Sequence, residues 1–225
     1  MRTTEKRMVP AAPDLDGSEA ENLLGEFRAL LRQVGLPGAA AGLDVPFWAA
    51  ALDAPLAPGR FLEDYLEQLL LPRELPAIVT ACGCACRGEL RELLAQDQSL
   101  AAALLASPFA APSRRTGWLH LARLRPLRDD RIVQRYLAAV ESGQAHGWHT
   151  IVYGVTLAVY SLPLRQGLLH YSHATLAALA SAAGRSENIS EPELDAMLSG
   201  LLARVPQGIE ATLATGCRGA FLPQV

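Results

Sequence analysis

The chain has 225 residues, half of them hydrophobic, with a formal net charge of −3 and a pI near 6.0. This length and apolar content are enough to bury a core as a single domain. The charge gives no general attraction to nucleic acid or to an anionic membrane. The N-terminal residues carry charges and lack the apolar segment of a secretory signal, so we expect a cytoplasmic protein.

The chain divides into a lead-in, a long helical region and a short tail. Residues 1–17, with Pro10 and Pro13 among mixed charges, are predicted to be disordered. We expect one all-helical domain over residues 18–215 and a C-terminal tail over 216–225. No alternating apolar and polar segment predicts a strand, so the expected fold is an all-α, single-domain bundle of about ten helices.

Apolar residues at helical spacing locate most of these helices. The capping box from Ser18 to Glu21 begins the first of them, and Asp44 is expected to cap a short second one. Asp97 is expected to cap a further short helix. The remaining predicted helices before the centre of the chain span about 59–71, 74–96, 113–124 and 128–142.

The central stretch, residues 146–185, is the least polar part of the chain. No charged side chain lies between His149 and Arg165, and Leu162-Pro163 divides the stretch into two segments of helical length. We predict two buried helices joined by a short turn. The longest uncharged run within this stretch falls short of the roughly 20 apolar residues that a membrane span needs. A second capping box, Ser190 with Glu193, predicts a helix to about Val205, followed by a last helix over 208–215.

Cysteine and histidine spacing offers weak candidates for a metal site. The candidates are Cys82, Cys84, Cys86, His170 and His173. Cysteines two residues apart on a helix do not share a face, so at most two of the three could bind one ion. We interpret all five as core or groove residues and expect no resident metal or cofactor. The alternative is a small helical metal-binding or redox protein that uses the cysteines and histidines.

Several enzyme classes lack their motifs in this chain. The only lysine is Lys6, and no glycine-rich loop ends in Gly-Lys-Ser/Thr, which excludes a P-loop nucleotide hydrolase. No Glu-x-x-His pair is present for a di-iron helical bundle. Cys217 has no nucleophile turn or oxyanion hole beside it. We therefore expect no catalytic residue.

Arginines concentrate between positions 114 and 135. We interpret this region as a solvated face, and docking onto an acidic protein surface is the main alternative. Nucleic-acid binding is disfavoured because the interleaved aromatic residues are limited to Trp118 and Tyr136. His146, Trp148 and His149 lie at a helix start, where packing and an interface role are equally compatible with the sequence.

The central stretch contains a His, a Gly, a Leu and a Ser-Ala-Ala-x-Arg signature, which are His149, Gly154, Leu162, Ser181, Ala182, Ala183 and Arg185. With these residues the stretch resembles the UreF family of urease accessory proteins. Residues 111–124 add Ser113, Arg115 and Gly117, and residues 61–102 keep the order of the family's earlier helices. The chain departs from the family at residues 35–43, which keep only Leu36, Pro37 and Gly38 of a longer motif, at residues 188–191, and at its C-terminus.

This resemblance implies an all-α, non-catalytic scaffold. Such a protein would join UreD (also called UreH) and the GTPase UreG on apo-urease while nickel is delivered, and it would form a homodimer. We predict partner contacts at Arg114, Arg115, His146, Trp148, His149, Ser181, Ala182, Ala183 and Arg185. A further hypothesis is a UreF-derived protein that no longer takes part in urease assembly.

Overall fold

The computed structural model describes residues 58–105, 107, 109–187 and 189–220, and within this part every regular element is a helix. The predicted all-α fold is therefore confirmed. The predictions for the lead-in at 1–17, for the helices near Ser18 and Asp44, and for the Leu36–Gly38 loop lie outside the described residues. The elements are α3 (Pro58–Tyr65), η2 (Leu66–Glu74), α4 (Leu75–Arg87), α5 (Leu90–Leu104), α6 (Ala110–Leu124), α7 (Arg131–Glu141), α8 (His149–Val159), α9 (Leu164–Glu187), α10 (Glu191–Leu202) and α11 (Val205–Ala220).

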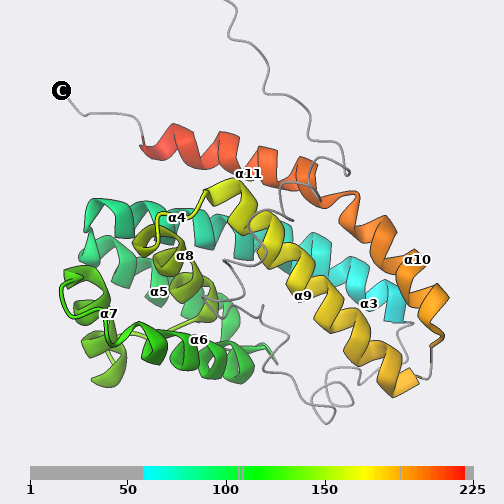
Figure 1. Cartoon of the computed structure of the whole chain (residues 1–225), viewed down its shortest axis with the longest axis horizontal. Coiled ribbons are helices and arrows are strands. Elements are labelled where there is room, and N and C mark those ends of the chain that lie inside the picture. Colours follow the sequence, from blue (N-terminus) through cyan, green and yellow to red (C-terminus); the bar gives the residue numbers. More distant parts are fainter. Residues whose placement is uncertain (1–57, 106, 108, 188, 221–225) are drawn as a thin grey trace, which may run out of the picture.

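Helix α8 lies at the centre of the molecule, as the uncharged sequence of the central stretch predicts. All residues from His149 to Leu157 are buried. α8 packs chiefly against α4 and α6. In Figure 1, α5 to α8 gather at one end of the molecule, whereas α3, α9 and α10 form the other end and α11 runs along one side.

Two clusters of buried apolar side chains stabilise this arrangement. The first includes Leu62, Leu70, Leu169 and Ile209 and joins α3, η2, α9 and α11. The second is built around Trp148 and joins α5, α6, α7 and α8. Helices α4 and α8 contribute side chains to both clusters, so the two ends of the molecule share a continuous core.

The turn between α8 and α9 forms where proline is expected to break the helix. Ser161 has a left-handed φ of 51°, and the Leu162 N–H donates to the Leu157 carbonyl over 2.8 Å. This bond across six residues and the left-handed residue before its donor form a Schellman end. The predicted capping box is also present, because the Glu193 carboxylate accepts from the Ser190 N–H over 3.2 Å at the start of α10.

The prediction of one helix over 74–96 followed by a helix capped by Asp97 is wrong. Gly88 adopts a left-handed φ of 70° and ends α4, and its N–H bonds back to the Ala85 and Cys84 carbonyls. Helix α5 then continues through Asp97, whose side chain points into the core. Gly88 readily adopts the left-handed conformation that ends a helix, and so the helix ends there although the apolar residues on both sides keep a helical spacing.

A π-helical segment, η2, connects α3 to α4 and replaces the predicted helix end near Leu71. Pro72 lies inside it, and the Leu75 N–H bonds to the Leu70 carbonyl, five residues back. The wider π turn accommodates a proline, which has no N–H to donate. Residues 59–87 therefore form one continuous helical rod.

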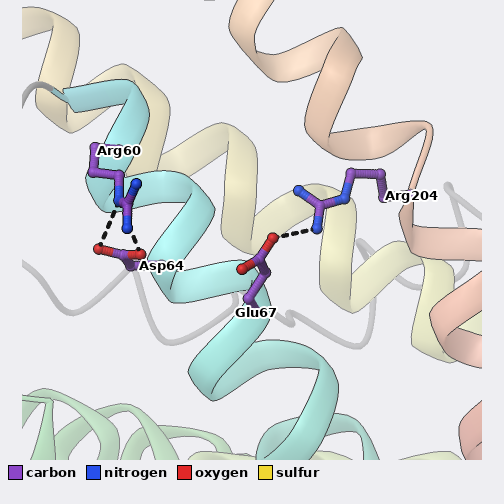
Figure 2. Close-up of polar contacts among 4 residues, drawn as sticks. All are labelled: Arg60, Asp64, Glu67 and Arg204. Carbon is purple, nitrogen blue, oxygen red and sulfur yellow. Dashed lines mark hydrogen bonds and ion pairs between the residues drawn. The ribbon is translucent and has the colours of Figure 1, made fainter.

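Two ion pairs lie on the solvent side of this rod, and one of them connects it to the C-terminal helices. Figure 2 shows Arg60 beside Asp64 within α3, and Arg204, from the turn before α11, reaching Glu67 of η2. These side chains are largely exposed, so each pair contributes at most about 1 kcal/mol. The last helix is longer than predicted, since α11 begins at Val205 and extends past Thr215.

By length and composition, the rod at 59–87 is also long and apolar enough to cross a membrane. Half of its most apolar window is buried inside the protein. Among the described residues it is the single helix that meets these criteria. Its apolar residues, including Leu62, Leu66 and Leu70, pack in the first core cluster, which accounts for its hydropathy.

Candidate functional site

His149, the first residue of α8, occupies a buried polar position between two other helices. Its Nδ1 lies 2.7 Å from the Ser113 hydroxyl of α6, and its Nε2 hydrogen-bonds to the Tyr171 hydroxyl of α9. The two rings also stack. Burial, and then the nearby His120, lowers the pKa of His149 to about 3. The ring is therefore neutral at pH 7, with one nitrogen donating and the other accepting.

Glu74, at the end of η2, is the acceptor at the other end of this chain of polar groups. The Tyr65 hydroxyl donates to its Oε2 over 2.9 Å, and the Tyr171 hydroxyl donates to the same oxygen over 3.1 Å. Burial raises the pKa of Glu74 to about 7, although both tyrosine hydrogen bonds act in the opposite direction. Among the described residues, the groups that act on this carboxyl are two phenols, and no cation contributes to the shift of its pKa.

The hydrogen positions follow from the number of donors. The Tyr171 hydroxyl has one hydrogen, which it gives to Glu74, so His149 must donate to Tyr171 from Nε2. His149 Nδ1 then accepts from Ser113. Every donor in this series of hydrogen bonds therefore points toward Glu74, and hydrogen bonds aligned in this way polarise one another.

A series of hydrogen bonds links buried helices through five residues, which are Ser113, His149, Tyr171, Glu74 and Tyr65. They join α6, α8, α9, η2 and α3, and each is buried. A serine beside a histidine is also the pairing of a nucleophile with its base. In this chain both side chains are almost fully buried, and the second histidine nitrogen is already bound to Tyr171. The geometry supports a structural role for the pair.

Asp97 anchors the segment that leads into α8. Its carboxylate accepts from the Tyr136 hydroxyl over 2.6 Å and from the backbone N–H groups of His146 and Gly147 over 2.6 and 3.1 Å. Its backbone carbonyl accepts from the Trp148 indole over 2.9 Å. Local sequence gives no sign of this role, because these partners lie 39 to 51 residues away along the chain.

The candidate metal ligands are dispersed. Cys82 and Cys84 are buried in different core clusters, whereas Cys86 is exposed. Burial, and then the neighbouring Cys86, raises the pKa of the Cys82 thiol to about 12, which disfavours the thiolate form that binds metals. His170 is buried and His173 half-buried on α9. Among the described residues, no three His, Cys, Asp or Glu side chains form a group that could hold a metal ion.

Comparison with known proteins identifies the family of this chain. A sequence model of the UreF family matches residues 55–202, which is more than half of the chain. The chain belongs to the UreF family. UreF proteins are urease accessory proteins. No curated protein matches the chain in sequence.

Most UreF motif positions in this chain support the fold. A Cβ atom on Gly117 would lie 1.9 Å from the Gly147 carbonyl oxygen, and one on Gly154 would lie 2.6 Å from the Ile78 carbonyl oxygen. Only glycine allows α6 and α8 to approach these backbones so closely. Together with the bond between Ser113 and His149, these contacts give the residues at these positions a structural role in this chain.

The structure separates the predicted UreF contact residues into surface and core. Arg114 and Arg115 are exposed on α6, and His146 is half-buried with its ring stacked on Trp148. Trp148 and His149 are buried, contrary to the expectation of a surface there, because Asp97, Ser113 and Tyr171 bind their polar atoms.

The Ser-Ala-Ala signature on α9 divides in the same way. Ser181 is exposed, whereas Ala182 and Ala183 are buried where α9 packs against its neighbours. Ala182 and Ala183 therefore have little surface to offer a partner. Arg185 also lies on α9, but its side chain is not among those that the structure describes.

Proposed function

We propose that this chain is a non-catalytic scaffold in urease maturation. In this role it joins UreD (UreH), the GTPase UreG and apo-urease while nickel passes to the urease active site. The observation that carries the proposal is the UreF family match, which covers residues 55–202. Nickel is the cargo of this assembly, and the scaffold needs no metal of its own.

The packing of the core suits a scaffold. The polar chain from Ser113 to Glu74 and the Asp97 anchor fix α6, α8 and α9 relative to one another. A scaffold acts through a coupling free energy between its docking sites, and such coupling needs elements that hold a defined arrangement. We propose Arg114, Arg115, His146 and Ser181 as contact residues, a homodimer as the working form, and the cytoplasm as its location.

The direct test is reconstitution with UreD, UreG and apo-urease from the same source. We expect a stable complex by size-exclusion chromatography with light scattering, which also reports the oligomeric state. We also expect higher nickel content and activity of urease when the chain is included. Failure to bind either UreD or UreG at low salt contradicts the scaffold role.

Metal analysis of untagged protein separates this role from the alternative of a metal or redox protein. The scaffold proposal expects less than about one tenth of an equivalent of tightly bound metal. Stoichiometric metal that is lost in a Cys82→Ser/Cys86→Ser variant would favour the alternative.

A further inference from the structure

The outward side of α6 combines positive charge with exposed apolar side chains. Arg114 and Trp118 lie one turn apart, and Arg115, Leu119 and Arg123 lie on successive turns beside them. These two rows cover the outward half of the helix. All five are exposed, with Trp118 at 39% and Leu119 at 54% of their full surface. We call these five residues the α6 face.

The charge of the α6 face is not balanced within the helix. Residues 110–124 contain arginines at 114, 115 and 123 and no acidic residue. Arg114 and Arg115 form no ion pair with any residue that the structure describes. An exposed tryptophan among arginines is the composition of an interface centre, where both types are enriched.

A surface hollow continues the α6 face beyond the end of the helix. It has a volume of about 720 Å³ and is lined by Ala122, Arg125, Pro126, Arg128 and Gln134. Arg125 is paired with Glu141 over 2.6 Å. The Asp130 carboxylate is already used to cap α7, where it accepts from the Val133 N–H. The hollow therefore adds a further basic side chain, Arg128, next to the C-terminal end of α6.

We propose that the α6 face, together with this hollow, is the docking surface for an acidic segment of a partner protein. The inference rests on the proposed scaffold function. Trp118 and Leu119 would be buried against apolar side chains of the partner, and the arginines would form paired hydrogen bonds with its carboxylates. A protein partner fits better than a nucleic acid because a single exposed aromatic ring gives bases little to stack on.

The test measures the affinity of purified UreD and UreG for variants of the full chain. Arg114→Glu/Arg115→Glu and, separately, Trp118→Ala should each weaken one of these complexes about tenfold or more. The matched control is Arg73→Glu/Arg91→Glu, which makes the same charge change at exposed positions on η2 and α5. It should stay within about twofold of the wild type. Raising salt from about 50 to 500 mM should weaken the wild-type complex more than the Arg114→Glu/Arg115→Glu complex.

A photoreactive residue identifies what lies on the α6 face. With Leu119→p-benzoylphenylalanine, we expect a cross-link to an acidic segment of the partner, mapped by mass spectrometry. A cross-link to residues 1–57 of the same chain, to a second copy, or to nucleic acid overturns the inference.

The two proposals fail in different ways. If the wild type binds UreD and UreG and the α6 variants bind equally well, the docking surface is wrong and the scaffold role stands. If the wild type fails to bind UreD or fails to bind UreG, the scaffold role itself is contradicted. Circular dichroism of each variant checks that α6, whose mutated residues all face solvent, remains folded.

Discussion

Glu74 shows how one buried carboxyl can make stability depend on pH. Its donors come from α3 and α9, and burial raises its pKa from 4.5 to about 7. The folded protein therefore holds a proton on Glu74 at pH values where the unfolded chain has lost it. Stability from this group is complete below about pH 4.5 and is lost as the pH rises through 7.

A Glu74→Gln variant should remove this dependence, because glutamine stays neutral and still accepts from the tyrosines. The free energy of unfolding of the wild type, relative to the variant, should fall by about 3 kcal/mol between pH 4.5 and pH 7.5. Urea unfolding at several pH values measures this difference. His149 and His120, whose lowered pKa values favour folding at higher pH, are present in both proteins and cancel.

The control for this comparison is Glu67→Gln, which removes an exposed carboxylate from the same π-helical segment. It should reproduce the wild-type pH profile. A Glu74→Gln protein whose stability differs from that of the wild type by the same amount at every pH would show that Glu74 is ionised throughout this range.

At the scale of elements, glycines set how closely the helices pack. Gly117 of α6 contacts the backbone that leads into α8, and Gly154 of α8 contacts the backbone of α4. In both cases the nearest atoms belong to the backbone, which cannot rotate away as a flexible side chain can. These glycines are therefore required by contacts between helices, at some cost in helix propensity.

Gly117→Ala should destabilise the protein by about 3 kcal/mol, since α6 must move away from the Gly147 carbonyl. Gly200→Ala, in α10, is the matched control, because a Cβ atom there would have no neighbour within 4 Å. It should stabilise the protein by about 0.5–1 kcal/mol through helix propensity. Thermal unfolding followed by circular dichroism compares the two, and equal effects would contradict the packing argument.

At the scale of the whole molecule, α4 and α8 connect the two core clusters. Each cluster has its own apolar side chains, but α4 and α8 contribute to both of them, and the polar chain from Ser113 to Glu74 crosses between them. Neither end of the molecule can lose its packing without exposing these shared helices. The described region should therefore behave as one cooperative unit.

This expectation can be tested with probes of different parts of the fold. In a Trp48→Phe/Trp118→Phe background, the fluorescence of Trp148 reports the second cluster, in which it is buried. Far-ultraviolet circular dichroism reports all helices. The two urea transitions should coincide, with midpoints within about 0.2 M of each other. Separate midpoints would show that the clusters unfold independently.

The sequence by itself determined the features that depend on neighbouring residues. The all-α class, the break at Leu162-Pro163, the buried course of α8 and the capping box at Ser190 each follow from spacing or from local residue chemistry. The family resemblance on His149, Gly154 and Gly117 belongs with them, and the UreF match confirms it.

Only the tertiary structure decided the roles of Asp97, Glu74, Trp148 and His149. Aspartate is a common helix-capping residue, yet the partners of Asp97 lie on α7 and in the segment that leads into α8. Glu74 bonds to Tyr171, which is 97 residues away. The local pattern of residues indicates the conformation of a segment. The exposure of its side chains and their polar partners depend on which segments pack together in the folded protein. For this reason the sequence predicted Trp148 and His149 as contact residues, and folding placed them in the core.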